Sequence, residues 1–195
     1  MEKTMKKTMK KTNNGFSLVE LIIVIAIMAI LAGAIAPALI RYIDKSRKSN
    51  DISAGKTIKT AVETALSYEK TFELMTTGNV TTINDVDGRS ITYAGSIEIT
   101  PNTATSGTGA GITLHQAVNA DQDAQGLADT KVEIGNNIGE HTPKIRYKKA
   151  ANGSLVPTEF VAFVSAGGNI VVGVGASTSS GDFYQLAPEI SKYYN

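Results

Sequence analysis

Residues 16–40 read FSLVELIIVIAIMAILAGAIAPALI, a run of 25 residues whose only charged member is Glu20. As an α-helix this run is about 37 Å long at a rise of about 1.5 Å per residue, and the hydrocarbon core of a bilayer is about 30 Å thick. The run therefore predicts a helix that spans a membrane or that serves as an export signal.

The segment before the apolar run is basic, with five lysines and one glutamate in residues 1–15. An ordinary secretory signal peptide has the same order, and Ala34-Ile35-Ala36 would be its cleavage site. Three features count against it. The apolar stretch exceeds the usual length of about 7 to 15 residues, Pro37 would directly follow the cut, and Glu20 lies inside the run.

Glu20 needs an explanation, because a carboxylate in an apolar helix costs free energy on membrane insertion. One interpretation is that Glu20 reaches the cytoplasmic interface and has no further role. The other is that cleavage after Gly15 leaves Phe16 with a free α-amine, whose reference pKa is about 7.7 to 8.0. That amine lies about one helical turn from Glu20 and would pair with the carboxylate of a second, axially staggered helix.

The segment from Lys11 to Ile22, KTNNGFSLVELI, resembles the class III signal of type IV prepilins. That signal has a basic leader, a Gly before the cut, a hydrophobic residue after it and a Glu at the fifth position of the mature chain. Pro37 also stands where pilins have a helix-kinking proline. The resemblance covers residues 16–43 residue by residue and the rest of the chain only in general architecture.

The resemblance implies that a prepilin peptidase cuts between Gly15 and Phe16 and N-methylates Phe16. It implies that Glu20 registers the incoming subunit and that Pro37 kinks the helix. The chain would be a single-pass protein of the cytoplasmic membrane before assembly and then part of an extracellular pilus. Its partners would be further copies of itself in a homopolymer filament, minor pilins, a membrane platform protein and an assembly ATPase, because the chain has no P-loop of its own.

The chain contains no cysteine, which excludes disulfides and thiolate chemistry. Many pilins close their C-terminal region with a disulfide, and this chain is similar instead to the cysteine-free pilins of Gram-positive bacteria such as clostridia. We hypothesise that aromatic rings of the tail pack back onto the sheet and substitute for the disulfide. The rings in question are Phe183, Tyr184, Tyr193 and Tyr194.

Beyond Pro37 the sequence has no strong stop signal before Thr76-Thr77-Gly78-Asn79, and this predicts one helix over residues 16–76. Residues 41–56 are polar and are expected to be solvated or to face neighbouring subunits. The following residues recur at helical spacing and predict a buried stripe: Ile58, Ala61, Val62, Ala65, Tyr68, Phe72 and Met75.

From residue 80 the period changes towards two, which indicates strands. The strands with the clearest pattern are 159–165 and 169–175, joined by a tight turn at Ala166-Gly167-Gly168. Four segments have a weaker strand pattern: 90–100, 112–118, 131–134 and 144–148. Segment 101–111 is small and polar and is expected to be an exposed loop.

These patterns predict an α+β fold, in which a long N-terminal helix kinked near Pro37 packs its C-terminal half on an antiparallel sheet, and the resemblance implies that this is the pilin fold. The predicted parts are a cleaved leader (1–15), a transmembrane and polymerisation helix (16–40) and a globular headgroup (41–195). Within the headgroup we expect an αβ-loop over 77–143 and the sheet and C-terminal region over 144–195.

The sequence offers no convincing catalytic or metal site, so we expect no enzyme activity, no cofactor and no metal. Asp121-Gln-Asp123 starts like a calcium loop, but Val132 stands where a bidentate carboxylate is required. Asp85 and Asp87 indicate a turn, the glycines of 107–111 lack phosphate-loop spacing, and His115 and His141 have no acid at metal-binding spacing.

The function that the resemblance implies is a structural subunit, of the major type, in a type IV pilus for adhesion, surface motility, biofilm formation or DNA uptake. No obligatory nucleic acid is expected. Three alternatives stay open: a pseudopilin of a type II secretion-like system or a minor pilin, a static single-pass anchor, and an enzyme or binding domain on such an anchor.

Overall fold

The computed structural model describes residues 16–116, 124–151, 153, 154, 156–176 and 183–195. The predicted leader, with Gly15, and the segment Asp121-Gln-Asp123 that starts like a calcium loop lie outside these residues. The chain divides into two compact units, Met1–Ile43 and Asp44–Asn195. We call the second unit the head.

Helix α1 (Leu18–Leu66) belongs to both units and contains Pro37 in its interior. It stops earlier than predicted, because the chain turns at Ser67 and Tyr68 before a separate short helix, α2 (Glu69–Thr76). At this turn the Ser67 hydroxyl donates to the Thr64 carbonyl at 2.6 Å, and a side-chain bond of this kind competes with helix continuation.

The break after Leu66 corrects part of the predicted buried stripe. The members on α1, from Ile58 to Ala65, are buried, and so is Met75 on α2. The prediction is wrong for Tyr68 and Phe72, whose side chains are 55% and 39% exposed. Tyr68 lies in the turn and Phe72 follows it on α2, so the helical period of α1 no longer decides which way their side chains point.

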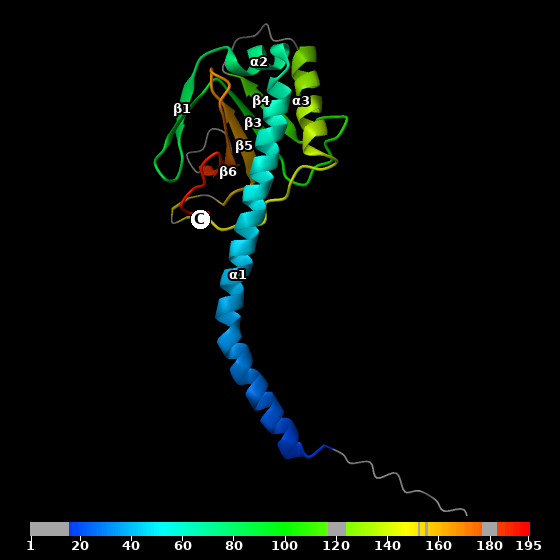
Figure 1. Cartoon of the computed structure of the whole chain (residues 1–195), viewed down its shortest axis with the longest axis vertical. Helices are drawn as coiled ribbons and strands as arrows, with labels where there is room; N and C mark the ends of the chain where they lie inside the picture. The colour runs from blue at the N-terminus through cyan, green and yellow to red at the C-terminus, as the bar shows by residue number, and fades with distance from the viewer. Residues whose placement is uncertain (1–15, 117–123, 152, 155, 177–182) are drawn as a thin grey trace, which may run out of the picture. The chain divides into compact units, whose positions relative to one another are not determined.

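The head is built on a five-stranded antiparallel sheet with the order β4-β3-β5-β6-β7. Helices α1 and α3 (Ala124–Ile138) lie on one side of this sheet (Figure 1). The α+β arrangement of a long N-terminal helix on an antiparallel sheet is therefore confirmed. The strands of the sheet are β3 (Gly95–Ile99), β4 (Ile112–Gln116), β5 (Glu159–Val164), β6 (Ile170–Gly175) and β7 (Phe183–Ala187).

The sheet is buried on both faces, and strand β5 shows why. Its side chains alternate, so Phe160 and Ala162 join the core beneath α1 and α3, whereas Val161 and Phe163 face the opposite side. There a two-stranded hairpin, β1 (Thr81–Asn84) and β2 (Ser90–Tyr93), packs Ile91 against them.

The hairpin between β5 and β6 was predicted correctly. Gly168 in its turn has φ +79°, a backbone conformation that favours glycine. The predicted strand over 90–100 is present as two strands, β2 and β3, and the predicted strand at 112–118 as β4.

Two strand predictions were wrong. Residues 131–134 belong to helix α3, whose buried residues Gly126, Thr130 and Ile134 follow each other at intervals of four. Residues 144–148 form no strand and pair with no described strand. Their apolar members, Ile145 and Tyr147, are nevertheless buried.

Segment 101–111 is only partly the exposed loop that was predicted, because Thr105 and Gly109 are buried. A Cβ atom on Gly109 would lie 2.6 Å from the backbone of Lys131 on α3. This segment is therefore packed against that helix.

Strand β7 lies at an edge of the sheet, and loops occupy hydrogen-bonding groups of that strand. The backbone N–H of Val86 donates to Phe183 O at 3.0 Å, and that of Ser191 donates to Gln185 O at 2.8 Å. Both acceptors are carbonyls of the edge strand.

Candidate functional site

The first half of α1 is the most unusual surface of the described chain. Every described residue from Phe16 to Tyr42 is exposed, although an 18-residue window in this helix has a mean hydropathy of 2.9. By length and composition α1 qualifies as a membrane span, and it is the one described helix that does. Soluble monomers seldom expose a contiguous apolar patch of this extent, so these residues need a lipid or protein partner outside their own chain.

The start of α1 is organised by Ser17 and Glu20. The backbone N–H of Ser17 donates to the Glu20 carboxylate at 2.9 Å, and the backbone N–H of Val19 donates to Ser17 Oγ at 3.3 Å. This reciprocal arrangement is a capping box, which satisfies N–H groups that have no partner inside the helix. In the isolated chain, the Glu20 carboxylate therefore binds the backbone N–H of Ser17.

The sequence analysis missed this role of Ser17, although a signal was present. Ser17-Leu18-Val19-Glu20 has the S-x-x-E spacing of a capping box directly before an apolar run. Phe16 precedes the box and is 88% exposed. The predicted cleavage between Gly15 and Phe16, methylation of Phe16 and kink at Pro37 stay predictions.

Small residues interrupt the apolar surface of this half of α1. Around Gly33 an added Cβ atom would meet nothing within 4 Å. Small side chains let helix backbones approach closely in membranes and in oligomers. The other members of this set are Ala26, Ala29, Ala32, Ala34 and Ala36.

Asp51 in the second half of α1 binds residues of the C-terminal part of the head. The sequence analysis expected its segment, residues 41–56, to be solvated or to face neighbouring subunits. The side chain of Asp51 is fully buried. The carboxylate accepts hydrogen bonds from the backbone N–H of Arg146 at 2.7 Å and of Tyr147 at 2.9 Å. The Tyr194 hydroxyl lies at 3.4 Å from the same carboxylate.

Burial dominates the protonation of this group. Desolvation raises the pKa of Asp51 above its usual value, and the hydrogen bonds from Arg146, Tyr147 and Tyr194 oppose the shift without cancelling it. Burial, with the negative charge of Asp51 next to it, likewise raises the pKa of the Tyr194 hydroxyl. Tyr194 is therefore a hydrogen-bond donor at neutral pH.

Tyrosine rings surround this anchor. Tyr147 lies 5.6 Å from Tyr194 and 5.9 Å from Tyr193, centroid to centroid, and Tyr184 lies 5.0 Å from Tyr193. The Tyr193 hydroxyl donates to Ala150 O at 2.6 Å, and Lys48 on α1 donates to Tyr193 O. The tail thus packs on both α1 and the sheet, as the hypothesis of a disulfide substitute requires.

The turn at Asp85 and Asp87 is a structural site. Asp85 accepts the backbone N–H groups of Asp87 and Arg89 and pairs with the Arg89 guanidinium at 2.7 Å. Arg89 also pairs with Glu189 at 3.1 Å. The β1–β2 hairpin is thereby joined to the C-terminal segment, in accordance with the predicted turn.

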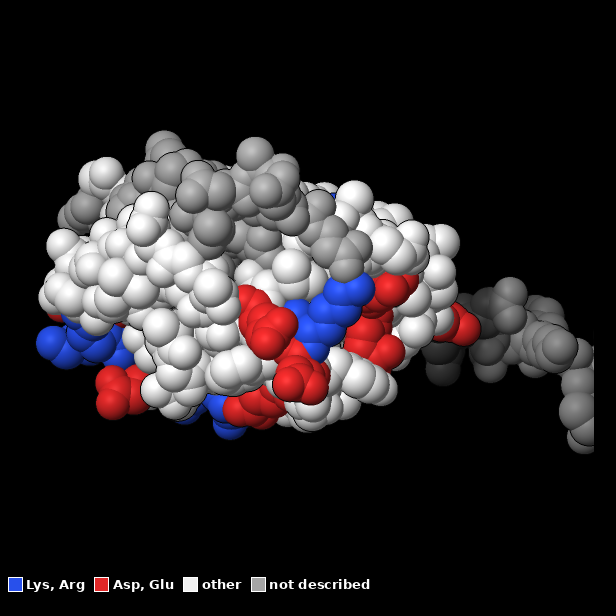
Figure 2. Space-filling model, turned by 90° about the horizontal axis from the view of Figure 1, so that it is seen from above, with Lys and Arg blue, Asp and Glu red and all other residues white. Residues whose placement is uncertain are grey.

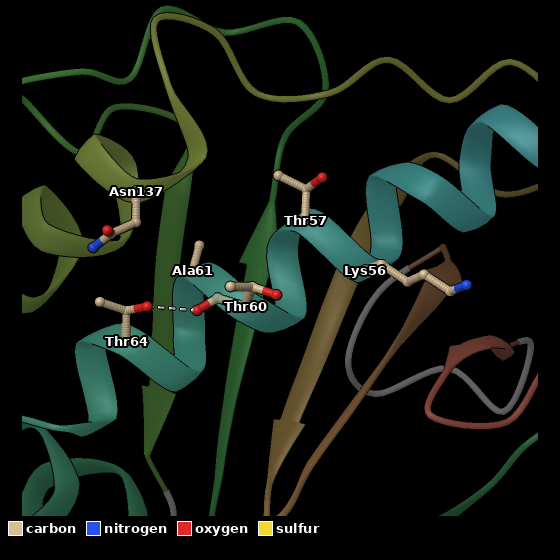
Figure 3. Close-up of a pocket in the computed structure, with 6 residues that line it drawn as sticks. All are labelled: Lys56, Thr57, Thr60, Ala61, Thr64 and Asn137. Atoms are coloured by element: carbon tan, nitrogen blue, oxygen red, sulfur yellow. Dashed lines mark hydrogen bonds between the residues drawn. The ribbon is translucent and has the colours of Figure 1, made fainter.

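A pocket of about 340 Å³ lies between α1 and α3 (Figure 3), and its geometry does not indicate catalysis. Its threonine hydroxyls serve the helix itself, since Thr57 donates to Ser53 O and Thr64 donates to Thr60 O. Asn137 faces them from α3 (Figure 3).

The histidines do not come together. His115 lies on β4 with its ring 3.0 Å from Glu98, and His141 forms an isolated bridge with Ala104. Among the described residues, no group of three or more His, Cys, Asp or Glu side chains could hold a metal ion.

Comparison with known proteins places a match on the N-terminal segment. Residues 10–36 match the family described as the prokaryotic N-terminal methylation motif. The chain is 52% identical over 60 residues to the type IV major alpha-pilin of Moraxella bovis, and 43% identical over 58 residues to the type IV major fimbrial protein FimA of Dichelobacter nodosus. It is 45% identical over 67 residues to fimbrial protein Q of Moraxella bovis.

These matches cover 29 to 34% of this chain and 36 to 43% of the relatives. The predicted resemblance to type IV pilins is thereby confirmed, and the aligned part is about a third of the chain. No solved structure matches the chain.

Proposed function

We propose that this chain is a type IV prepilin, and that its mature form polymerises through the first half of α1 into a surface fibre. The observation that carries the proposal is the exposed apolar half of α1, which lies in the segment that matches the methylation motif. The proposed parts are the leader (1–15), the polymerisation helix (16–40) and the headgroup (41–195).

Both states in the proposal remove the apolar half of α1 from water. Before assembly the helix lies in the cytoplasmic membrane as a single span, because its apolar run is long enough to cross the hydrocarbon core. In the fibre the same side chains pack against copies of the same helix. The chain therefore moves from lipid to an oligomer without exposing these residues to solvent.

Glu20 exchanges partners in this scheme. In the isolated chain its carboxylate accepts the N–H of Ser17. Cleavage after Gly15 creates a cationic amine on Phe16, and that amine on a neighbouring subunit offers a charged partner in place of a neutral one. Both bonds have an ionised acceptor, but only the second joins two opposite charges, and this Coulomb attraction favours the exchange.

The remaining roles follow from the resemblance to pilins. A prepilin peptidase would cleave and N-methylate the chain, and a cytoplasmic ATPase with a membrane platform protein would drive assembly, together with minor pilins. The chain would be a major pilin, because the relatives it matches include proteins described as major pilins. Adhesion, surface motility, biofilm formation and DNA uptake are the uses that such a fibre would serve. The subunit itself would be structural and non-enzymatic.

The test is to shear cells, collect surface filaments and determine the N-terminus of this polypeptide by mass spectrometry. The proposal predicts fibres whose subunit begins with N-methylated Phe16. A chain that begins at Met1 and stays in the membrane would indicate an anchor. A chain that begins at Pro37 in the medium would indicate a secreted domain. Processed subunits without long fibres would favour a pseudopilin.

A further inference from the structure

We propose that the heads of two subunits bind each other end to end, through surfaces of opposite charge. The first surface is a groove lined by cations of residues 144–148, which we call the basic groove. The second is the exposed side of α2 with Glu69, Phe72 and Glu73, which we call the acidic end. This inference rests on the proposed function, because it names a contact that would join heads within the fibre.

The basic groove is an open pocket of about 610 Å³ in the head. Lys144, Arg146 and Lys148 contribute the positive part of its lining. The remaining lining is uncharged and includes Pro101 and Val156, of which Val156 is 46% exposed. The groove therefore offers an apolar surface next to three positive charges.

The fold fixes the direction of the three cations. They are exposed, whereas the residues between them, Ile145 and Tyr147, are buried in the core. The backbone N–H groups of Arg146 and Tyr147 donate to the Asp51 carboxylate at 2.7 and 2.9 Å. The segment is thus held against α1 by its backbone, and the charged side chains point away from the core.

The charge of the basic groove is not neutralised by an ion pair. The ion pairs of the described residues involve other cations, and Asp44 on α1 pairs with Lys149. Arg146 acts on the buried Asp51 only as the smallest of the influences that lower the pKa of that carboxyl. The groove therefore keeps positive charge that a partner can neutralise.

Helix α2 presents an apolar ring next to two carboxylates. Glu69, Phe72 and Glu73 are exposed, and the buried residues of α2 lie on its other side. Residues three and four positions apart are neighbours on a helix surface, so Phe72 and Glu73 both lie beside Glu69. A Cβ atom on Gly168 would lie 2.8 Å from the Phe72 ring, and the β5–β6 turn therefore supports this ring from one side.

The acidic end also keeps unneutralised charge. Like charges at positions i and i+4, such as Glu69 and Glu73, destabilise a helix, and the ion pairs of the described residues involve other acids. Lys70 on the same helix has an interaction of its own, and two glutamates with one lysine give α2 a net charge of −1. Figure 2 views the head from this end and shows acidic side chains gathered around basic ones. A cationic partner would relieve the repulsion between the two glutamates.

The two surfaces cannot meet within one head. The basic groove is tied to α1 at Asp51, whereas α2 follows the end of α1 at Leu66. These two positions are separated by about 22 Å of helix, and residues 144–148 and α2 lie at opposite ends of the head (Figure 1). A contact between unlike surfaces of two copies leaves one surface of each kind open, and repeated contacts of this type build open filaments.

A second copy of this chain therefore suits the basic groove in both charge and apolar character. Phe72 supplies an apolar ring for the uncharged part of the groove, and Glu69 and Glu73 supply carboxylates for its cations. The guanidinium of Arg146 can bind both oxygens of one carboxylate. In the proposed fibre the copies are held at high local concentration, so a contact that is weak between free heads becomes populated.

The first experiment treats sheared fibres with a carbodiimide, which joins a lysine amine to a carboxylate in contact with it. Mass spectrometry should find peptides that link the lysines of the basic groove to Glu69 or Glu73, and these links should be absent from fibres dissolved into monomers before treatment. Such links join two copies, because the two surfaces lie at opposite ends of one head. The ion pair of Lys59 and Glu63 within α1 is the internal control and should be linked in both samples.

Charge reversal supplies a second readout, the yield of sheared fibres. The variant Lys144→Glu, Lys148→Glu places like charges in contact and should lower the yield at least about three-fold. The variant Glu69→Lys, Glu73→Lys should have the same effect. The chain that carries all four changes restores the attraction with reversed signs and should recover most of the yield.

The matched control is Lys56→Glu, Lys131→Glu, which makes the same charge change on α1 and α3, outside both surfaces. In this control the links between the basic groove and α2 should remain. The milder variant Lys144→Gln, Lys148→Gln replaces the reversal of the groove if that reversal fails to fold, and it should lower the yield in the same direction.

Three results would overturn the inference. One is fibres in which Lys59 and Glu63 are linked but the basic groove is linked to neither glutamate of α2. Another is a combined reversal that recovers no yield although each reversal alone lowers it. The third is a link from the groove lysines to a different polypeptide, since the occupant is then another protein. Absence of fibres from cells with the unchanged chain would instead count against the proposed function.

Discussion

The two halves of α1 share one continuous helix but have opposite surroundings. From Leu18 to Ile40 the helix is apolar apart from Glu20, and its side chains are exposed. From Asp44 to Leu66 it is amphipathic and buries Ile58, Val62 and Ala65 against the sheet. On the proposed function, lipid or other subunits bury the first half, whereas the fold of the head itself buries the second half.

This contrast teaches that the two halves respond to substitution in different assays. On the proposed function, we expect changes in the first half to alter insertion and assembly and to leave the stability of the head unaffected. Changes in the second half, and in the residues that contact it, alter the free energy of unfolding of the head. The predictions below separate these two responses.

The largest effect is expected for Glu20→Ala, which should lower the yield of sheared fibres at least about ten-fold. Without the Glu20 carboxylate, the cationic α-amine of Phe16 on the neighbouring subunit has no partner at the assembly site. Ser17→Ala removes the other half of the capping box and keeps the carboxylate. Loss of a cap costs about 0.5 to 2 kcal/mol of helix stability, so Ser17→Ala should lower the yield less. Equal losses in the two variants would show that Glu20 acts only as a cap.

Replacement of Phe183 or Tyr184 by Ala should destabilise the head by about 3 to 5 kcal/mol each. Both rings are almost fully buried, and the Tyr184 hydroxyl also accepts the N–H of Ala151 at 2.7 Å. The measurement is thermal melting of the fragment 41–195. Tyr42→Ala is the control, since Tyr42 is 72% exposed and its loss should cost less than about 0.5 kcal/mol. Unchanged melting of the Phe183 and Tyr184 variants would refute their role as a disulfide substitute.

Asp51→Asn should cost about 1 to 3 kcal/mol near neutral pH, because one buried backbone N–H loses its acceptor. It should also change the pH dependence. The folded pKa of Asp51 is raised from 3.8, so the folded state binds this proton more tightly than the unfolded state does. The contribution to stability is then complete below about pH 3.8 and falls as the pH rises through the folded pKa.

The measurement is the free energy of unfolding of the fragment 41–195 between pH 3 and pH 7, compared with that of Asp51→Asn. The decrease in the free energy of unfolding that the Asp51 carboxyl causes as the pH rises should be absent in Asp51→Asn. Asp44→Asn, which breaks an ion pair with exposed Lys149, should cost less than about 1 kcal/mol. A pH profile that Asp51→Asn leaves unchanged would contradict the raised pKa.

The smallest effect is expected for a glycine to alanine change made in each half of α1. A Cβ atom on Gly55 would lie 2.9 Å from Leu186 Cβ on β7. Overpacking of this kind costs about 1 to 3 kcal/mol. The higher helix propensity of alanine stabilises the helix by about 1 kcal/mol, so the head should become slightly less stable. Gly33→Ala meets no described atom within 4 Å and should leave the melting of the head unchanged. A stabilised Gly55→Ala variant would show that β7 can move away.

The sequence was sufficient to predict the first half of α1 and the β5–β6 hairpin, because both depend on local patterns. A run of 25 residues with a single charge has few alternatives to a span, and Gly168 supplies the positive φ that a tight turn requires. The sequence was insufficient for α3. Its buried residues include Gly126, Thr130 and Gly135, so the buried stripe is not apolar and the alternation in Lys131–Ile134 was taken for a strand.

The predictions of a solvated Asp51 and of a strand at residues 144–148 were wrong for one shared reason. The alternation in 144–148 is real, but the partner of its backbone is a carboxylate from a residue more than ninety positions away. A charged residue in a polar stretch is normally solvated, and only the tertiary fold brings the N–H groups that make its burial possible. At the candidate site, Glu20 was found from the sequence, while its partner Ser17 was overlooked despite the S-x-x-E spacing.

The blocked edge at β7 has a consequence for a crowded fibre surface. An edge strand with free carbonyl and N–H groups can recruit a strand from a neighbouring protein, and this leads to aggregation. Loop residues Val86 and Ser191 already occupy Phe183 O and Gln185 O. On the proposed function, heads displayed side by side at high local concentration would therefore be hindered from joining their sheets through β7.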